Sequence, residues 1–214
     1  MIKTKNLTKY YGDVCAVEDV SIQIEKSGAT VVFGLSGSGK TTLLRLIAGL
    51  DLPDKGEIYL DNHLVSKKQA AIPADQRKMG FVFQVPALWP HMTVEANILF
   101  GLYALEKNEA QLRLKEVLGQ TGLIGFDKRY PDQISAGQAR RVALARAIAP
   151  KPKYLLMDEP LTNIDAESKD KLINLIKTIS RDGQTFLLYV SHDASEVKQI
   201  SDRIIKIENG RLKV

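Results

Sequence analysis

The chain alternates short apolar runs with helical patterns, and this alternation predicts an α/β core. The runs at 29–33, 154–157 and 185–190 are uninterrupted, as expected of strands that are buried on both faces. Helical patterns follow them from about residue 40, over 165–181 and over 194–200.

The remaining apolar positions predict two further parts. Short alternating segments and a hairpin around Asp61-Asn62 indicate an antiparallel sheet, with strands expected at 2–7, 14–17, 20–24, 57–60 and 63–65. The residues Tyr10-Tyr11-Gly12-Asp13 are expected to form a turn. A strand at 80–83 ends at Gln84, and helices are expected over 94–122 and 138–149. A hairpin over 203–207 and 211–214 closes the chain. We therefore expect an α/β core at 1–85 and 151–214, with a helical subdomain inserted at about 86–150.

Glycines and a lysine separate the run at 29–33 from its helix. A strand, a glycine-rich turn and a helix are the context of a phosphate-binding P-loop. The glycines let backbone N–H groups wrap an anion, and the helix adds its positive dipole end. We expect Lys40 to contact the β- and γ-phosphates of a nucleotide, and the Thr41 hydroxyl to ligate Mg²⁺. The residues expected at the phosphates are Gly34, Ser36, Gly37, Ser38, Gly39, Lys40, Thr41 and Thr42.

Two carboxylates follow the run at 154–157 directly. In open α/β sheets, ligands bind beyond the carboxyl ends of the strands, so Asp158 and Glu159 are expected at the nucleotide. Asp158 would hold Mg²⁺, and Glu159 would orient or deprotonate the attacking water. An exposed acidic pair at a strand end is the simpler alternative.

Composition and charge argue against a nucleic-acid-binding protein and against a secreted protein with disulfides. The 214 residues carry a formal net charge of +5, but the basic residues are spread along the chain and do not alternate with aromatic residues. We therefore expect a solvated surface and no nucleic-acid partner. The N-terminus lacks the apolar core of a signal peptide, and the single Cys15 excludes an internal disulfide, so a cytosolic location is expected.

These motifs resemble the ATP-binding subunit of ABC transporters over essentially the whole chain. Residues 34–42 match the Walker A motif of that family and residues 155–160 match its Walker B motif. Ile134-Ser135-Ala136-Gly137-Gln138 matches the family signature, which usually reads Leu-Ser-Gly-Gly-Gln. The resemblance implies a single ABC ATPase domain over 1–214, with a P-loop core, an antiparallel β subdomain and the inserted helical subdomain.

The resemblance also implies a head-to-tail dimer that holds two ATP molecules between its subunits. Ser135, Gly137 and Gln138 would face the γ-phosphate bound by the other copy, although Ser135 alone fits an ordinary helix N-cap. Asp165, in the D-loop-like segment Thr162-Asn163-Ile164-Asp165, would lie at the interface. Asp165 also fits the N-cap of the next helix, and we expect it to serve both roles.

Three further side chains match family positions. Gln84 corresponds to the Q-loop glutamine that touches Mg²⁺ or the attacking water, and His192 to the switch histidine at the γ-phosphate. Tyr11 corresponds to the aromatic residue that stacks on adenine, with Tyr10 as the adjacent alternative. The catalytic residues implied are Glu159, His192, Lys40 and Gln84.

The transport role is implied by the same resemblance. No apolar run approaches the 18 or so residues of a membrane span, so a separate membrane subunit would provide the pore. Residues 85–94 resemble the region that receives a coupling helix from that subunit. The residues 158–165 resemble those of bacterial solute importers, which act with a solute-binding protein, and imply a place at the cytoplasmic face of the membrane. The chain stops soon after its last hairpin, so no C-terminal regulatory domain is expected.

Other classes remain as alternatives. An exporter ATPase would share the same motifs, and a non-transport ABC ATPase would typically carry paired cassettes or a long coiled-coil insertion. A GTPase would want an Asn-Lys-x-Asp segment, which the sequence lacks. Two positions depart from the family pattern. Ala136 replaces the first signature glycine, where a methyl group is expected to crowd the loop or restrict φ, and Arg140 stands where the family often has Gln.

Overall fold

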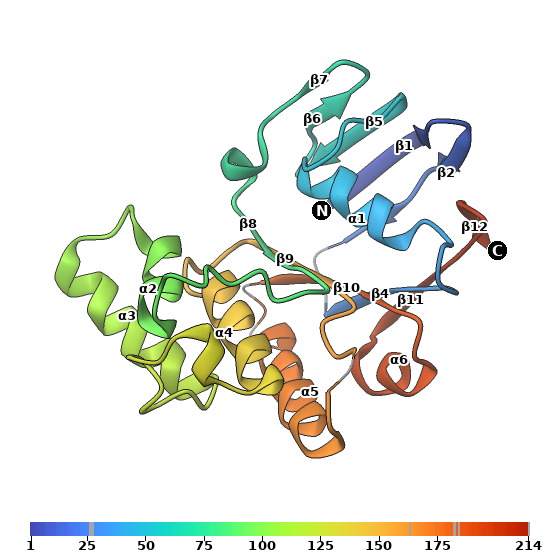
Figure 1. Ribbon diagram of the computed structural model, residues 1–214. Coiled ribbons are helices and arrows are strands. Elements are labelled where there is room, and N and C mark those ends of the chain that lie inside the picture. The colour runs from blue at the N-terminus through green and yellow to red at the C-terminus, as the bar shows by residue number, and fades with distance from the viewer. Residues whose placement is uncertain (26–27, 163, 182, 184, 214) are drawn as a thin grey trace. The chain divides into compact units, whose positions relative to one another are not determined.

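The structure is a computed structural model that describes residues 1–25, 28–162, 164–181, 183 and 185–213. Its contacts divide the chain into two compact units (Figure 1). Unit 1 comprises Met1–Met79 and Phe186–Val214, and unit 2 comprises Gly80–Thr185. The predicted single domain with a helical subdomain at about 86–150 stays a prediction.

Unit 1 contains the predicted antiparallel sheet. Its strands run in the order β2-β1-β5-β6-β7, and β3 also pairs with β1. Their bounds are β1 Ile2–Tyr11, β2 Val14–Val20, β3 Gln23–Ile24, β5 Lys55–Leu60, β6 His63–Lys67 and β7 Ala70–Ala71. The predicted turn is shorter in the structure, because Tyr10 and Tyr11 still pair with Cys15 and Val14 across the hairpin. Both tyrosines therefore lie on β1.

Unit 1 also contains a mostly parallel group of strands in the order β12-β11-β4-β10. Their bounds are β4 Ala29–Phe33, β10 Phe186–Ser191, β11 Arg203–Glu208 and β12 Arg211–Lys213. β4 runs parallel to both β10 and β11, and β12 pairs antiparallel with β11. Residues 29–32 and 186–191 are all buried, as their uninterrupted apolar character predicts. Val214, which the predicted hairpin includes, lies outside the described residues.

Three short helices complete unit 1. They are α1 Lys40–Ala48, the 3₁₀ helix η1 Ala74–Arg77 and α6 Ala194–Ile200. α1 buries the predicted face of Leu43, Leu44, Ile47 and Ala48, and it contacts β10 and β2. The strand, turn and helix that a P-loop requires are therefore present.

Unit 2 is mainly helical. Its two neighbouring strands are β8 Met79–Val82, which begins at the boundary with unit 1, and β9 Tyr154–Asp158. Its helices are α2 Val94–Leu99, η2 Phe100–Leu102, α3 Lys107–Gln120, η3 Pro131–Gln133, α4 Ala136–Ile148 and α5 Ala166–Arg181. α4 contacts α2, α3 and α5, so it is the central helix of the unit (Figure 1). None of the described helices has both the length and the apolar character to cross a bilayer.

Candidate nucleotide-binding site

The predicted phosphate loop connects β4 to α1 in unit 1. Its last glycine, Gly39, has φ +96°, and a Cβ atom there would lie 2.2 Å from the carbonyl oxygen of Ala16. A Cβ atom on Gly34 would lie 2.2 Å from the carbonyl oxygen of Ile207. Larger residues would therefore displace the loop from the strands behind it.

The chemistry of this loop suits an anion. Gly39 caps α1 without a side-chain acceptor, and the first turn of α1 has no acidic residue. The Ser38 hydroxyl is buried and has no hydrogen-bond partner in the described residues. Lys40 is only 3% exposed and donates from Nζ to the carbonyl of Leu35, at 2.7 Å. Cationic and N–H groups thus gather at a helix N-terminus that no carboxylate of its own first turn neutralises, and they fit a phosphate group.

In unit 2, the two predicted carboxylates lie at the end of β9. Asp158 is the last residue of that strand and is 4% exposed. Glu159 adopts φ +43°, a left-handed conformation that is uncommon for residues other than glycine. The N–H of Thr162 donates to the Glu159 carbonyl at 3.3 Å, so Glu159 begins a tight turn.

The Gln84 side chain contacts the first residue of this turn. Gln84 follows β8, and its Nε2 donates to Oε2 of Glu159 at 3.4 Å, which brings two of the predicted catalytic residues together. Arg140 of α4 lies beside both segments, because its guanidinium donates to the carbonyls of Gln84 at 2.5 Å and Thr162 at 2.7 Å. The local sequence pattern does not predict that Arg140 would link these two segments. Its only signal in the sequence is that Arg stands where the ABC ATPase family often has Gln.

Ser135 is the N-cap of α4, as predicted. Its hydroxyl accepts from the N–H of Gln138 at 3.2 Å, and the Gln138 side chain accepts from the N–H of Ser135 at 2.9 Å. This capping box starts α4 at Ala136, two residues before the predicted start. Ala136 is exposed and its φ is helical, so the expected crowding by its methyl group is absent within this chain. A Cβ atom on Gly137 would lie 3.1 Å from Oγ of Ser168, so this glycine permits close packing of α4 on α5.

Asp165 caps the next helix. Its Oδ1 accepts from the N–H of Ser168 at 2.9 Å, and this hydrogen bond is the main reason that its pKa is lowered. The predicted N-cap role is therefore confirmed. Asn163, which belongs to the predicted D-loop, lies outside the described residues.

His192 lies in unit 1 directly after β10 and is exposed. The strand end that presents it is held by Glu196, a buried carboxylate that accepts from the hydroxyls of Tyr189 at 2.8 Å and Ser191 at 2.7 Å. The Ser191 hydroxyl in turn accepts from the N–H of Asp193 at 3.0 Å. No local pattern in the sequence indicates this support.

The two candidate adenine-stacking residues differ in their partners. Tyr10 is 42% exposed and Tyr11 47%, so exposure does not distinguish them. The Tyr11 hydroxyl donates to Oδ2 of Asp51 at 2.6 Å, and Asp51 is also bound by the guanidinium of Arg45 from α1, at 2.8 Å. Partial burial, followed by the Asp51 hydrogen bond, raises the pKa of Tyr11. Tyr11 is thus tied, through Asp51, to the helix that follows the phosphate loop.

Arg77 fastens the other end of α1. It is 4% exposed, and burial lowers its pKa to about 10. Its five acceptors are the carbonyls of Leu46, Ile47, Val65 and Ile72 and the hydroxyl of Ser66, at 2.6–3.3 Å. The positive charge thus contacts the carbonyl end of α1, where the helix dipole favours it.

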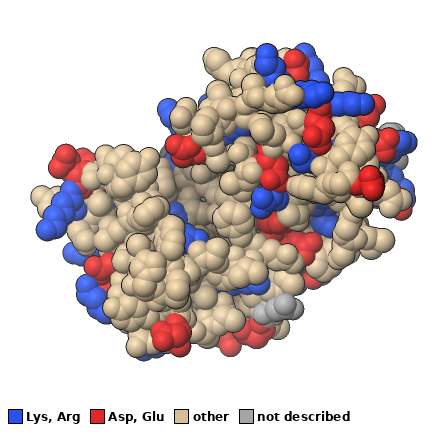
Figure 2. All heavy atoms as spheres, turned by 45° about the horizontal axis from the view of Figure 1, so that its top comes forward, with Lys and Arg blue, Asp and Glu red and all other residues tan. Residues whose placement is uncertain are grey.

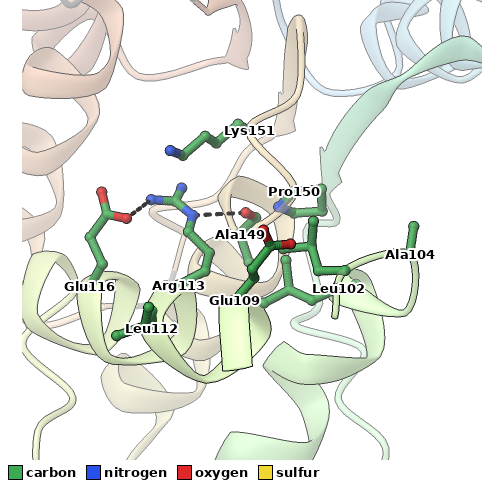
Figure 3. Close-up of a pocket in the computed structure, with 11 residues that line it drawn as sticks. Leu102, Ala104, Glu109, Leu112, Arg113, Glu116, Ala149, Pro150 and Lys151 are labelled. Carbon is green, nitrogen blue, oxygen red and sulfur yellow. Dashed lines mark hydrogen bonds and ion pairs between the residues drawn. The ribbon is translucent and has the colours of Figure 1, made fainter. Parts of the chain in front are cut away.

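Unit 2 has an open groove of about 510 Å³ that is separate from these contacts (Figure 3). The residues that line it come from 101–105, from 109–116 of α3 and from 149–151, and none is a predicted nucleotide-site residue. Arg113 lines the groove. It forms an ion pair with Glu116 at 2.7 Å and donates to the carbonyls of Ile148 and Ala149, each at 2.9 Å. These bonds hold the C-terminal end of α4.

Charged side chains do not gather by sign on the face shown in Figure 2, where Lys and Arg are interspersed with Asp and Glu. Among the described residues, no group of three or more His, Cys, Asp and Glu side chains is arranged to hold a metal ion.

Comparison with known proteins matches this chain to a family of transporters and to ATP-binding proteins of import systems. The family described as ABC transporter matches residues 17–162. The Fe(3+) ions import ATP-binding protein FbpC of Escherichia coli is 39% identical over 213 residues, which cover 99% of this chain and 60% of that protein. The sulfate/thiosulfate import ATP-binding protein CysA of Halalkalibacterium halodurans is 40% identical over 217 residues, with the same coverage of 99% and 60%. This chain therefore spans about 60% of the length of these relatives.

A solved structure has the same fold as this chain over nearly the full length of both proteins. The ATP-binding cassette MJ0796, as a dimer in a post-hydrolysis state bound to ADP and Pi, superposes with a TM-score of 0.86 at 33% identity. The match covers 100% of this chain and 97% of that one. The predicted α/β fold with a P-loop ATPase core is confirmed.

Proposed function

We propose that this chain, which belongs to the ABC transporter family, binds and hydrolyses ATP to power the import of a small solute through a separate membrane subunit. The observation that carries the proposal is the phosphate loop. Gly34 and Gly39 cannot accept side chains without displacing the loop, and buried Lys40 lies at a helix N-terminus whose first turn has no acid. This arrangement suits the phosphates of a nucleotide.

In this proposal, unit 1 binds the nucleotide. Backbone N–H groups of the loop and Lys40 contact the phosphates, Tyr11 stacks on adenine, and His192 contacts the γ-phosphate. Asp51 supports the choice of Tyr11 over Tyr10, because it holds the Tyr11 ring through its hydroxyl. The remaining phosphate contacts are assigned to Gly34, Ser36, Gly37, Ser38, Gly39, Thr41 and Thr42.

Unit 2 provides the groups for hydrolysis. Glu159 orients or deprotonates the attacking water, and Gln84, which contacts the Glu159 carboxylate, assists it. Asp158 is a buried carboxylate at a strand end, and Thr41 is an exposed hydroxyl at the start of α1. These are the oxygen ligands that Mg²⁺ prefers, so we assign the metal to Thr41, Asp158 and Gln84. Mg²⁺, when bound, would supply neutralisation of the phosphate charge.

The proposed assembly is a head-to-tail dimer. Ser135, Gly137, Gln138 and Asp165 are assigned to the nucleotide bound by the second copy, and the dimeric MJ0796 cassette supports this arrangement. The N-cap geometry of Ser135 leaves its hydroxyl at the positive end of α4, where an anion is favoured.

We also propose a membrane partner. Residues 85–94 form the docking segment. Arg146 of α4 supports this segment, because it donates to the carbonyls of Pro86 and Ala87 and stacks on Trp89. A permease that binds there places the chain at the cytoplasmic face of the membrane, where a solute-binding protein would deliver cargo to the permease. Import is the direction named for the FbpC and CysA relatives.

ATP turnover by the purified chain tests the enzymatic part. Glu159→Gln should still bind ATP and lose about 100-fold or more of its turnover, since general-base groups contribute roughly that much. Lys40→Ala should lose ATP binding or turnover. Glu57→Gln is the matched control, because this carboxylate lies on β5 and accepts from the hydroxyl of Tyr59. Wild-type turnover by Glu159→Gln would refute the assignment.

Co-purification from membranes tests the transport part. We expect the affinity-tagged chain to recover an integral membrane protein, and the solute bound by that complex would identify the cargo. Recovery of a ribosome or another soluble assembly in place of a membrane protein would refute the transport role and favour a non-transport ABC ATPase.

A further inference from the structure

We propose that Arg140 is a positioning residue for ATP hydrolysis, because it ties the two backbone segments that hydrogen-bond to Glu159 to helix α4. The inference rests on the proposed function and concerns a residue that does not itself touch the reacting atoms. It gives a role to a cationic side chain at a position where the ABC ATPase family often has Gln.

The geometry of the guanidinium makes this possible. Arg140 lies in the second turn of α4, and one of its terminal nitrogens donates to the carbonyl of Gln84 at 2.5 Å. The other terminal nitrogen donates to the carbonyl of Thr162 at 2.7 Å. A planar fork with fixed N–H directions can hold two separate carbonyls at once, and a charged donor makes each hydrogen bond stronger than a neutral one.

Both segments act on Glu159. Gln84 carries the amide that donates to the Glu159 carboxylate, at 3.4 Å. Thr162 closes the turn that Glu159 begins, through its N–H to the Glu159 carbonyl at 3.3 Å. Arg140 therefore holds the backbone of one neighbour and the far end of the turn that presents the carboxylate.

The strained backbone of Glu159 explains why the hydrogen bonds of Arg140 would affect catalysis. A residue other than glycine at φ +43°, as Glu159 has, persists only where surrounding structure holds it. A displacement of about 1 Å in a catalytic group can cost on the order of 100-fold in rate. If Arg140 is lost, the turn and the Gln84 segment lose the side chain that links both of them to α4, and the carboxylate is held less firmly in position.

The test separates positioning from binding and from folding. Arg140→Ala and Arg140→Gln are compared with wild type for kcat, for the Kd of ATP and for the melting temperature. We expect kcat to fall by about 10- to 100-fold, while the Kd changes by less than about twofold. Arg140→Lys should recover only part of the loss, because a single ammonium lacks the fork that spans both carbonyls.

Arg113→Gln is the matched control. Arg113 also donates from its guanidinium to two backbone carbonyls of unit 2, but these are the carbonyls of Ile148 and Ala149 and not those of Gln84 and Thr162. It should lower the melting temperature at least as much as Arg140→Gln and leave kcat unchanged. An equal loss of kcat in both variants would assign the effect to general loosening of unit 2 and overturn the proposal.

A double variant tests whether Arg140 acts through the Glu159 surroundings. In a Glu159→Gln background, where water activation is already lost, Arg140→Ala should lower the residual turnover by less than about twofold. Independent losses that multiply would overturn the proposal, as would unchanged kcat in Arg140→Ala. If instead the wild-type chain turns over no ATP, the proposed function itself fails, so the two failures are distinguishable.

Discussion

Replacing Arg77 with Met tests whether one buried side chain holds the phosphate-loop helix on the antiparallel sheet. The guanidinium of Arg77 reaches the last turn of α1, the strand β6 and the carbonyl of Ile72, all within unit 1. Met has a similar length and no donor. The change therefore removes the hydrogen bonds while it keeps most of the buried volume.

The expected loss follows from the acceptors left behind. The carbonyls of Leu46 and Val65 keep backbone donors, from Gly49 at 3.1 Å and Ile72 at 2.8 Å. The loss then falls on three acceptors, the carbonyls of Ile47 and Ile72 and the Ser66 hydroxyl.

A buried neutral acceptor that loses its partner costs about 1–3 kcal/mol. Removing the charge also relieves its desolvation, which is visible in the pKa of Arg77 lowered to about 10 by burial. We therefore expect the lower end of that range for each of the three acceptors, about 3 kcal/mol in total.

Urea unfolding, followed by circular dichroism, measures this difference. Arg77→Met should lower the unfolding midpoint with an unchanged slope, and Arg77→Lys should fall between it and wild type, since an ammonium cannot reach all the acceptors. Arg129→Met is the control, because Arg129 is exposed and stacks on Phe126. A loss below about 1 kcal/mol in Arg77→Met would show that water or other donors satisfy these acceptors, and it would refute the reasoning.

Three further predictions concern the site. Gly39→Ala should weaken ATP binding at least tenfold in a titration, because its Cβ would meet the carbonyl of Ala16; unchanged affinity would mean that the loop is not held there. Ser135→Ala should cost about 1 kcal/mol of stability through the lost N-cap, and Ser135→Thr should restore most of it, as thermal unfolding can check. The carboxylate of Asp51 has a pKa below its ordinary 3.8, chiefly because Arg45 donates to it, so its stabilising effect is present above about pH 4 and is lost as the pH falls lower. The difference in melting temperature between wild type and Asp51→Asn should therefore shrink below pH 4, and a difference that stays constant would contradict this assignment.

The sequence predicted the elements whose signals are local. The run at 29–33 and the helix at 194–200 have the predicted bounds, because apolar continuity and an Asp193 cap are visible in a few neighbouring residues. β9 and β10 each extend one residue further than predicted, to Asp158 and Ser191, because pairing in a sheet overrides the polar character of a final side chain. α4 begins two residues before the predicted start, because the capping box between Ser135 and Gln138 includes Ala136 and Gly137 in the first turn of the helix.

Contacts between distant residues were not predictable. Arg140 binds a carbonyl 56 positions away, and Tyr11 binds a carboxylate 40 positions away. No periodicity or short motif encodes such pairs, because the hydrogen bonds exist only once separate elements have packed. The supports of the proposed site, including Arg77 and Glu196, therefore had to be found in the structure, whereas the phosphate loop itself was visible as a motif.

The phosphate loop depends on residues made much later. The Ser38 carbonyl accepts from the N–H of Gly210 at 3.0 Å, and Gly34 packs against the carbonyl of Ile207. These partners are about 170 residues apart in the chain, so a ribosome moving at roughly 5–20 residues per second needs about ten seconds or more to supply them. A nascent chain that already displays the whole Walker A motif should not yet hold a nucleotide. Acquisition of ATP binding during translation would then mark the emergence of the last hairpin, not that of the motif.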